Sequence, residues 1–220
     1  MDSLVLLGSV APTLIHHAAE EGFDLIAMST HGRSGLSKFF YGSVAEELLR
    51  ASPVPLLLVR PDFEPTRFRR ILVPLDGSKR AESILSLATG FAKASGGELL
   101  IVTVLPAPQP ERVTWHKVQE SRGKVEAAGV PAKIVVRYGD PLKEILRVGQ
   151  MREVDLIALS THGRTGMERF RFGSVAEEIL KKSKIPLLVQ RTVGVLPRYQ
   201  GGVRSKYKAL RRLAEKVEKL

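Results

Sequence analysis

A glycine-containing loop joins an apolar segment to an amphipathic segment in the second half of the chain. The apolar segment Leu156–Leu159 is followed directly by Ser160. The loop then passes Gly163 and ends at Gly173 and Ser174. Because glycine has no side chain, its backbone N–H groups can approach a phosphate closely, and a helix that begins near Ser174 directs its free N–H groups and its dipole toward an anion. These residue types at this spacing predict a phosphate-binding loop.

A second group of polar residues follows another apolar run. Residues 70–76 form this run, which contains Pro74 and ends at Asp76. In a sheet of parallel strands, ligands bind beyond the carboxyl ends of the strands, where the strand order reverses. If both segments end at that point, Asp76 is placed to accept a hydrogen bond from a nucleotide base or ribose.

The same loop also has a purely structural interpretation. Ser174 and Glu177 have the spacing of a capping box, in which two side chains satisfy the start of a helix without any ligand. The loop is not a P-loop, because no Gly-Lys-Ser or Gly-Lys-Thr follows its glycines, and the Gly-x-Gly-x-x-Gly pattern of dinucleotide sites is absent from the chain. The residues alone leave phosphate binding and helix capping as open alternatives.

The loop and its flanking segments occur twice. Residues 24–60 align without a gap with residues 155–191, which lie 131 positions further along the chain. The register continues upstream, so that residues 4–7 fall on a predicted strand, and we interpret this apolar opening as a strand and not as a signal sequence. Upstream of that strand the repeat ends. The first copy therefore corresponds to the second half of a unit whose complete version occupies residues 69–192.

Strand and helix signals alternate through this complete version. Ser78 is placed to cap a helix over residues 79–95, which Gly96 and Gly97 end. Apolar strands separated by helices predict a parallel sheet with right-handed crossovers, and thus a doubly wound α/β domain of five strands and four helices. The predicted strands are residues 70–76, 99–105, 132–139, 155–160 and 186–191, and the other predicted helices are residues 111–128, a short helix from Pro141 and a helix from Ser174.

The chain divides into four parts. They are an incomplete domain (residues 1–61, the half-copy), a linker (62–68), the complete unit (69–192) and a tail (193–220). The tail has apolar residues at three- and four-residue steps, and its eight basic and two acidic residues carry more than half of the net charge of +11. This basic amphipathic helix either packs on the protein's own sheet or its dimer mate, or binds an acidic membrane surface or nucleic acid.

Composition excludes several classes of protein. The chain has 220 residues and no cysteine, which excludes disulfide frameworks, thiolate zinc sites and cysteine nucleophiles. No apolar run approaches the ~18 residues of a membrane-spanning helix. We therefore expect a soluble, cytoplasmic protein.

Three motifs together resemble the universal stress protein family. They are ILVPLDGS (71–78), YGDP (138–141) and STHGRTGMERFRFGSVAEEIL (160–180). The resemblance covers residues 69–191 as a whole domain and residues 4–60 as the latter half of another. It implies an α/β sheet of five parallel strands in the order 3-2-1-4-5, and commonly a dimer.

ATP-binding members of that family share a signature of Gly, two residues, Gly, nine residues, Gly, and Ser or Thr. By position it falls on Ser160, Gly163, Gly173 and Ser174, so a serine replaces the first glycine, as Ser29 does in the half-copy. A side chain then stands where the backbone should approach a phosphate. The resemblance implies ATP, alone or with Mg, as the ligand of Pro74, Asp76, Val102, Val104, Ser160, Gly163, Arg164, Gly173, Ser174 and Val175, with Asp76 at the adenine-ribose end and Val102 or Val104 against the base.

Histidine and arginine within the loop have alternative roles. Arg164 either contacts a phosphate, which its planar guanidinium matches, or faces solvent. For His162 a structural hydrogen bond is favoured over catalysis, because no partner completes a Ser-His-Asp or paired-carboxylate arrangement. His16 and His17 are adjacent and lie on different faces of a helix, so they do not form a metal pair. We expect no metal site and no enzymatic turnover.

Three functions agree with this sequence. The first is a nucleotide-binding stress-response protein that senses or stores ATP and acts through conformation or choice of partner. The second is a family member that binds no nucleotide and serves as a dimeric interaction scaffold. The third is a slow ATP hydrolase, against which the absence of an evident base or metal set argues.

Assembly follows from what the half-copy does not contain. In the order 3-2-1-4-5, the strand at residues 24–28 should lie beside a first strand that the half-copy lacks, which leaves its edge open. The strand at residues 56–60 can pair with its counterpart at residues 187–191. We therefore expect either a homo-oligomer or a chain whose start lies further upstream.

Overall fold

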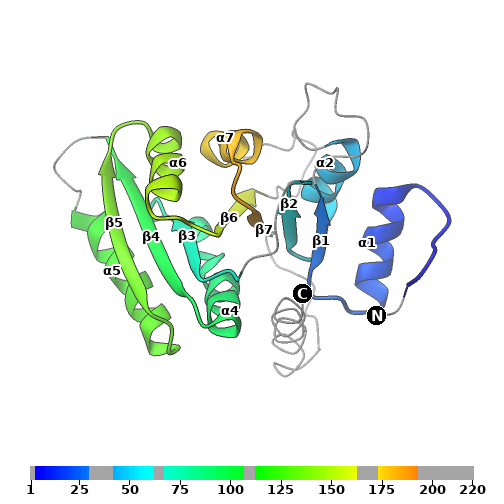
Figure 1. The fold of residues 1–220 in the computed structure, drawn as a ribbon, viewed down its shortest axis with the longest axis horizontal. Helices are drawn as coiled ribbons and strands as arrows, with labels where there is room; N and C mark the ends of the chain where they lie inside the picture. Colours follow the sequence, from blue (N-terminus) through cyan, green and yellow to red (C-terminus); the bar gives the residue numbers. More distant parts are fainter. Residues whose placement is uncertain (1–2, 30–41, 62–66, 107–111, 163–172, 193–220) are drawn as a thin grey trace.

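The computed structural model describes residues 3–29, 42–61, 67–106, 112–162 and 173–192. They form one sheet of seven strands with helices on both faces (Figure 1). The strands are β1 (Ile26–Ser29), β2 (Leu56–Val59), β3 (Arg70–Pro74), β4 (Glu98–Leu105), β5 (Ala132–Tyr138), β6 (Leu156–His162) and β7 (Leu187–Thr192). The helices are α1 (Val10–Glu20), α2 (Gly42–Ala51), α3 (Lys79–Glu82), α4 (Leu85–Ser95), α5 (Arg112–Ala127), α6 (Pro141–Met151) and α7 (Ser174–Lys182).

The complete unit has the expected topology. Its strands lie in the order β5-β4-β3-β6-β7 and pair in parallel throughout, which is the order 3-2-1-4-5. The first strand, β3, is therefore central, and the chain turns to opposite sides of it when it forms β4 and β6. Helices α4 and α5 pack on one face of the sheet, whereas α6 and α7 pack on the other. The prediction of a doubly wound α/β fold is confirmed.

The half-copy extends the same sheet through its last strand. Strand β2 pairs with β7 in antiparallel fashion, with Leu57 opposite Leu188. These two residues are counterparts in the repeat, 131 positions apart. On either side of them, Leu56 pairs with Val189, which is the counterpart of Leu58, and Leu58 pairs with Leu187, which is the counterpart of Leu56. A pseudo-two-fold axis thus passes through the sheet at Leu57 and Leu188, and the expected pairing of the two terminal strands is confirmed.

Two arginines hold this junction on both sides of the axis. Arg60 donates from Nε (3.1 Å) and Nη2 (2.8 Å) to the carbonyl oxygen of Ser183, at the end of α7. Its repeat counterpart, Arg191, donates from Nη1 to the carbonyl oxygen of Arg50, in the last turn of α2, at 2.7 Å. Each guanidinium therefore satisfies an end carbonyl of the other copy's helix and lies at the negative end of that helix's dipole.

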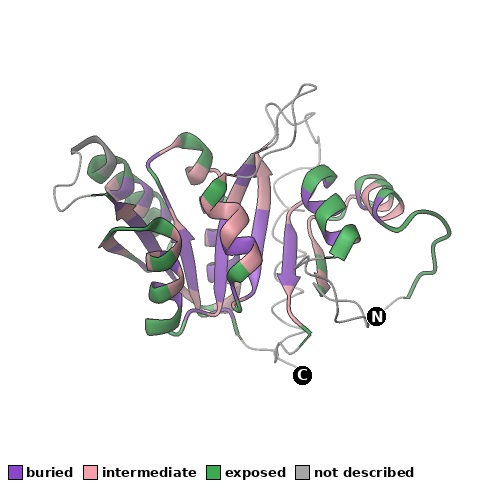
Figure 2. Ribbon diagram, turned by 90° about the horizontal axis from the view of Figure 1, so that it is seen from above, coloured by how far each residue is buried: buried purple, intermediate pink, exposed green. Residues whose placement is uncertain are grey.

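Buried side chains fill the centre of the sheet and thin out toward the half-copy (Figure 2). The core forms two clusters, one on each face. The cluster beneath α6 and α7 continues into the half-copy through Leu48, Leu56 and Leu58, all at most 2% exposed. The half-copy is therefore packed onto the complete unit by a shared core as well as by backbone pairing.

The predicted helix over residues 79–95 is two helices in the structure. Ser78 caps the first by accepting the N–H of Ala81 at 3.1 Å, and Gly96 ends the second in the left-handed conformation, both as predicted. The break follows from the carbonyl oxygen of Arg80, which accepts the backbone N–H (3.1 Å) and the hydroxyl (2.8 Å) of Ser83. Because these short-range bonds use the oxygen that would bind the N–H of Ile84, α3 ends there.

The predicted strand at residues 4–7 was wrong. These residues belong to no strand or helix, and Val5 and Leu7 are 89% and 94% exposed. Their counterparts in β5 pair with β4, for example Val135 with Val102, and the described residues of the half-copy include no equivalent of β4. A strand without a neighbour to pair with does not form. The tail of residues 193–220 lies outside the described residues.

No helix in the described part of the chain is long and apolar enough to cross a membrane. Nor do the described residues contain a group of three or more His, Cys, Asp or Glu side chains that could hold a metal ion.

We predict that Arg60 stabilises the junction between the copies. Arg60→Ala should lower the free energy of unfolding by about 1.5 kcal/mol, because it leaves a helix-end carbonyl without its charged donor. The matched control is Arg50→Ala, which removes only an exposed ion pair to Glu46 and should change stability by less than about 0.5 kcal/mol. Urea-unfolding curves measure both, and equal effects of the two substitutions would contradict this role of Arg60.

Candidate functional site

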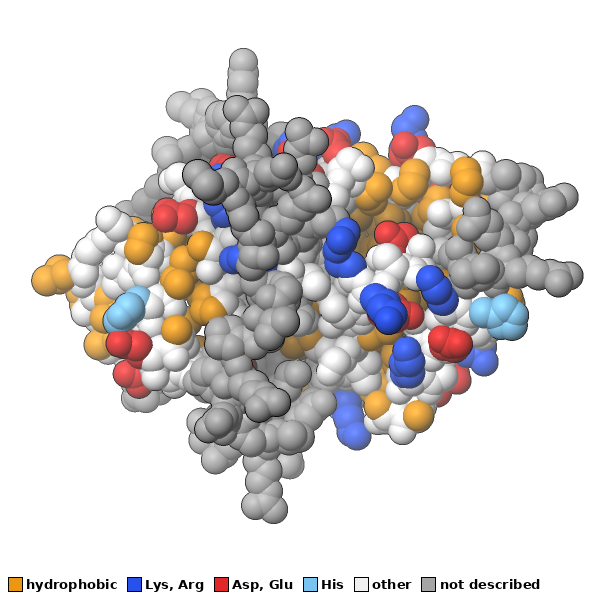
Figure 3. Space-filling model, turned by 180° about the vertical axis from the view of Figure 1, so that it is seen from behind, with side chains coloured by type: hydrophobic (Ala, Val, Ile, Leu, Met, Phe, Trp, Pro, Cys, Tyr) orange, Lys and Arg blue, Asp and Glu red, His pale blue; other side chains and the backbone are white. Residues whose placement is uncertain are grey.

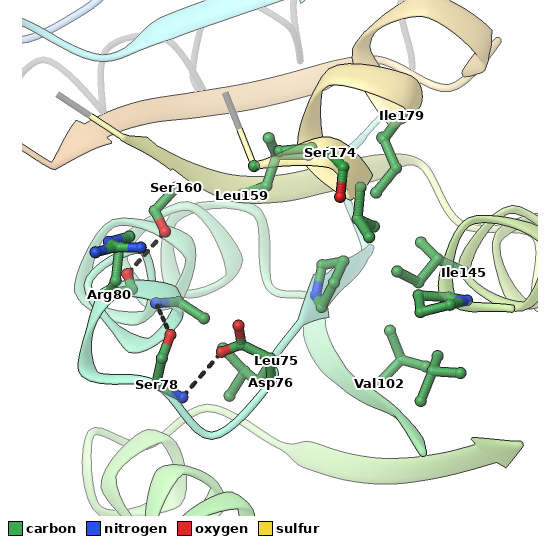
Figure 4. Close-up of a pocket in the computed structure, with 17 residues that line it drawn as sticks. Leu75, Asp76, Ser78, Arg80, Val102, Ile145, Leu159, Ser160, Ser174 and Ile179 are labelled. Atoms are coloured by element: carbon green, nitrogen blue, oxygen red, sulfur yellow. Dashed lines mark hydrogen bonds between the residues drawn. The ribbon is translucent and has the colours of Figure 1, made fainter. Parts of the chain in front are cut away.

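A cavity of about 290 Å³ opens at the carboxyl ends of β3, β4 and β6. It lies at the point where the chain passes to the two sides of β3, which is where doubly wound sheets bind ligands. Helices α3, α6 and α7 also contribute to its wall (Figure 4). The residues that line it are Pro74, Leu75, Asp76, Ser78, Arg80, Ala81, Val102, Val104, Pro141, Ile145, Leu159, Ser160, Gly173, Ser174, Val175, Ala176 and Ile179.

The structure brings together the predicted ligand-binding residues that it describes. All of them line this one cavity: Pro74, Asp76, Val102, Val104, Ser160, Gly173, Ser174 and Val175. The remaining two, Gly163 and Arg164, lie outside the described residues. The grouping of these residues is thus observed, whereas their binding of a nucleotide stays a prediction.

One side of the cavity is apolar. Val102 and Val104 stand two residues apart on β4 and so face the same side of the sheet, toward α6 and α7. Ile145 from α6 and Ile179 from α7 lie across from them. Val102, Ile145 and Ile179 are buried, at 1%, 4% and 1% exposed. A flat apolar group such as a nucleotide base fits this surface.

A tight turn after β3 holds the carboxylate of the cavity. Asp76 Oδ1 accepts the N–H of Ser78 at 2.9 Å, and Gly77 between them has φ of 77°, which favours glycine. Ser78 in turn caps α3. The Asp76 side chain is therefore oriented by its own turn and is exposed, and its Oδ2 can accept a hydrogen bond from a hydroxyl or an amine.

The capping box, which the sequence left open as an alternative at the start of α7, is not present in the structure. Gly173 is the N-cap residue, Ser174 is the first helical residue, and no side chain of the described part of the chain caps this end. Glu177 Oε1 instead accepts from Lys181 Nζ at 2.6 Å, and this hydrogen bond raises the pKa of Lys181. A hydrogen bond from the neighbouring Lys182 lowers the pKa of Glu178. Among the described residues no side chain caps the first-turn N–H groups of α7, and Gly173, Ser174 and Val175 line the cavity.

Ser160 occupies the position at which the family signature has glycine. Its Oγ donates to the carbonyl oxygen of Arg80 at 2.7 Å (Figure 4). The hydroxyl is therefore directed toward α3 and away from Ser174. Since Ser160 ties the end of β6 to α3, the side chain that the sequence suggested would crowd a phosphate has a structural partner.

Sequence reasoning missed the contribution of α3 and α6 to the cavity. Arg80 and Ala81 reach it because α3 starts immediately after the Asp76 turn and lies beside the end of β6. Pro141 and Ile145 reach it from α6, whose N-cap Asp140 accepts the N–H of Lys143 at 2.8 Å. The sequence signal for α6 was present in the YGDP motif, because Asp-Pro begins a helix, but its distance to β3 could not be inferred.

None of the histidines whose side chains the structure describes lines the cavity. His16 pairs with Glu20 at 3.0 Å on the surface, and His17 packs against Phe23 with ring centroids 5.5 Å apart. His162 is the last residue of β6, opposite Thr192 of β7, and its side chain lies outside the description. Within the described residues, Asp76 is the only carboxylate that lines the cavity.

Comparisons with known proteins agree on one family. The sequence model of the universal stress protein family matches residues 2–60 and 67–191. A universal stress protein of Methanocaldococcus jannaschii is 30% identical over 138 residues, which cover 56% of this chain and 81% of that protein. One of Synechocystis sp. is 27% identical over 173 residues, which cover 77% of this chain and 58% of that protein.

Solved structures of the same family share the fold. A universal stress protein from Archaeoglobus fulgidus superposes with a TM-score of 0.66 and 28% identity, over 79% of this chain and 64% of that chain. The chain thus spans less than two thirds of the Synechocystis and Archaeoglobus proteins. Two other universal stress proteins were solved in complex with cAMP and with dAMP, but their TM-scores of 0.47 and 0.45 to this chain assign no ligand to it.

We predict that the two serines of the cavity differ in their effect on stability. Ser78→Ala should lower the free energy of unfolding by about 1 kcal/mol, because it removes the cap of α3. Ser174→Ala should change it by less than about 0.5 kcal/mol, because Ser174 lies inside α7 and caps nothing. Urea unfolding of both variants measures the difference. A decrease in the free energy of unfolding for Ser174→Ala as large as that for Ser78→Ala would show that Ser174 caps α7.

Proposed function

The chain belongs to the universal stress protein family, and we propose that it binds an adenine nucleotide, ATP, in the cavity at the ends of β3, β4 and β6. The single observation that carries the proposal is the start of α7. Its first-turn N–H groups have no side-chain cap in the described structure and open onto a cavity with an apolar wall and one oriented carboxylate. A helix start whose N–H groups are free in this way favours an anion, which supports the proposal.

Each part of the cavity suits one part of a nucleotide. The base packs on Val102 and Val104, and Asp76 accepts from the ribose or the base. The phosphates lie at the backbone N–H groups that begin α7, next to Ser174. A cavity of about 290 Å³ is at the lower end of small-molecule sites, so we place the base, the ribose and the first phosphate within the described walls.

Binding without turnover is the activity that this wall supports. Hydrolysis requires a base that activates water, and commonly a metal site. Asp76 is the one carboxylate on the described wall, and one of its oxygens is bonded to the Ser78 N–H. We therefore propose a regulatory role, in which bound nucleotide sets the conformation or partner choice of the protein, in keeping with a stress-response function.

A second candidate function is that of an interaction scaffold without a nucleotide. The observation in its favour is Ser160, which departs from the ATP-binding signature of the family. The Ser160 hydroxyl donates to Arg80 and is not directed into the phosphate end of the cavity. The serine is therefore only a weak argument against ATP binding.

We predict that Gly173→Val reduces affinity for ATP at least ~10-fold. Valine at this position places two methyl groups where the phosphates approach the first N–H groups of α7. The fold should persist, because Gly173 has φ of −58° and ψ of 139°, which valine adopts without strain. Isothermal titration should give one ATP per chain for the unmodified protein, since the half-copy has no counterpart of Asp76 among its described residues.

The matched control for that substitution is Gly123→Val. Gly123 lies in α5, away from the cavity, and a side chain added there meets open space. Affinity for ATP should be unchanged in this variant. Equal affinities of the unmodified protein and Gly173→Val, or two sites per chain, would show that the start of α7 is not the phosphate site.

We also predict that Arg80 contributes to recognition of the outer phosphates. It is the one arginine or lysine on the described wall, and it stands beside Ser160 at the mouth of the cavity. Arg80→Ala should weaken ATP about 10-fold and AMP less than about 2-fold, because only ATP extends its charge to the mouth. Lys79→Ala, an exposed cation on the same helix that does not line the cavity, is the control. Equal losses for ATP and AMP would contradict this assignment.

A further inference from the structure

Helix α3 forms part of the cavity wall but has little apolar contact that would hold it there. It consists of the four residues Lys79–Glu82, none of which is buried, and its one apolar residue, Ala81, is partly buried against the core. A single turn is unstable on its own, and helices in proteins are stabilised chiefly by an apolar face. The position of α3 therefore depends on the turns that flank it and on hydrogen bonds from other elements.

The carbonyl oxygen of Arg80 receives the bond that joins α3 to the sheet. Ser160, near the end of β6, donates to it from Oγ at 2.7 Å, and Ser83 donates to it from Oγ at 2.8 Å. Ser83 Oγ also lies 3.1 Å from Oγ1 of Thr192, the last residue of β7. Since a serine hydroxyl has one hydrogen, Ser83 accepts from Thr192. Strands β6 and β7 thus both reach α3 at one acceptor, and Ser160 contacts that acceptor directly.

Another hydrogen bond holds the outer side of α3. The buried Ser121 of α5 donates from Oγ to Glu82 Oε1 at 2.9 Å. Neither of these two residues lines the cavity, whereas Arg80 and Ser160 both do. Among the described residues, the Ser160 hydroxyl is therefore the group of the cavity wall that joins α3 to a strand.

Arg80 is the residue whose position this bond sets. It is the one arginine or lysine on the described cavity wall, and it stands beside Ser160 at the mouth (Figure 4). A guanidinium binds a phosphate as a planar fork, so its contribution depends on where its backbone is held. If α3 were free to shift, part of the binding free energy would be needed to order it.

We propose that Ser160 is a positioning residue that makes the site selective for ATP over AMP. This inference rests on the proposed function of nucleotide binding. The Ser160 hydroxyl holds the backbone of Arg80, so the guanidinium meets the outer phosphates without first having to order α3. AMP ends within the described walls, and its affinity does not depend on this bond. Serine at the position of the signature's first glycine therefore strengthens the preference for ATP.

The first test compares the affinities for ATP and AMP by isothermal titration. Ser160→Ala should weaken ATP about 5-fold and AMP less than about 2-fold, because a segment must then be ordered when ATP binds. Ser160→Thr retains the hydroxyl and should retain the ratio of the two affinities. Lysine and arginine side chains lie at many places on the complete unit, together with acidic ones (right in Figure 3), and attract ATP in general. Both substitutions leave the net charge unchanged, so a change in the ratio does not come from that attraction.

The matched control is Ser95→Ala. Ser95 Oγ donates to the carbonyl oxygen of Phe68 at 2.6 Å, so it also ties a helix, α4, to a distant segment, but it does not line the cavity. This variant should have a lower free energy of unfolding than the unmodified chain and the same ratio of ATP to AMP affinity. A general loss of stability is thereby separated from a loss of positioning.

A double variant tests whether Ser160 acts through Arg80. Once the guanidinium is removed, its position no longer matters. Arg80→Ala alone and Arg80→Ala combined with Ser160→Ala should therefore bind ATP with affinities that agree within about 2-fold. If Ser160 contacted a phosphate itself, or if the whole cavity loosened without its hydroxyl, the two losses of affinity would multiply.

The outcomes distinguish this inference from the proposed function on which it rests. A ratio of ATP to AMP affinity that falls in Ser160→Ala, is kept in Ser160→Thr and falls no further in the double variant than in Arg80→Ala supports the proposal. An unchanged ratio in Ser160→Ala, losses that multiply, or tighter ATP binding in Ser160→Gly overturns it and leaves the proposed function standing. Failure of the unmodified chain to bind either nucleotide overturns the proposed function, and this inference with it.

Discussion

The reversal of strand order at β3 is the constraint on which the rest of this structure depends. Parallel strands need crossovers of one hand, so a chain that moves first to one side of β3 and then to the other must place its helices on opposite faces. Helices α4 and α5 therefore cover one face and α6 and α7 the other. Between the carboxyl ends of β3, β4 and β6 no crossover can fill the space, and the cavity lies there. The apolar wall, the Asp76 turn and the start of α7 meet for this topological reason.

Much of this arrangement could be predicted from residues that act locally. Alternating apolar strands and helices, the Ser78 cap and the Gly96 stop all depend on neighbours in sequence, and the structure contains each of them. The group of residues at the cavity followed from the resemblance to a family, because spacing alone left helix capping open. The domain boundaries, the basic tail and the roles of Gly163 and Arg164 stay predictions.

The parts that could not be predicted depend on contacts between distant residues. The carbonyl oxygen of Arg80 accepts from Ser83 nearby and from Ser160, which is 80 positions away, and this crowded acceptor both divides the predicted helix and brings Arg80 to the cavity. The alternative of a capping box does not apply because Gly173, and not Ser174, is the N-cap residue of α7, and Glu177 accepts a hydrogen bond from Lys181. Residues 4–7 have the composition of a strand, but pairing needs a neighbour that the described half-copy does not provide.

The repeat shows how far local sequence determines structure in this chain. Helices α1 and α2 form in the half-copy where α6 and α7 form in the complete unit, and β1 and β2 where β6 and β7 form, although one copy is complete and the other is not. Their amphipathic pattern needs only one packed face, which the shared core and the β2–β7 junction supply. Burial, in contrast, depends on the whole unit. Ala158 is 0% exposed, whereas its counterpart Ala27 is exposed. A site that needs β3 as well as β6 can therefore form only in the copy that has both, so the half-copy contributes stability at the junction while the complete unit carries the cavity.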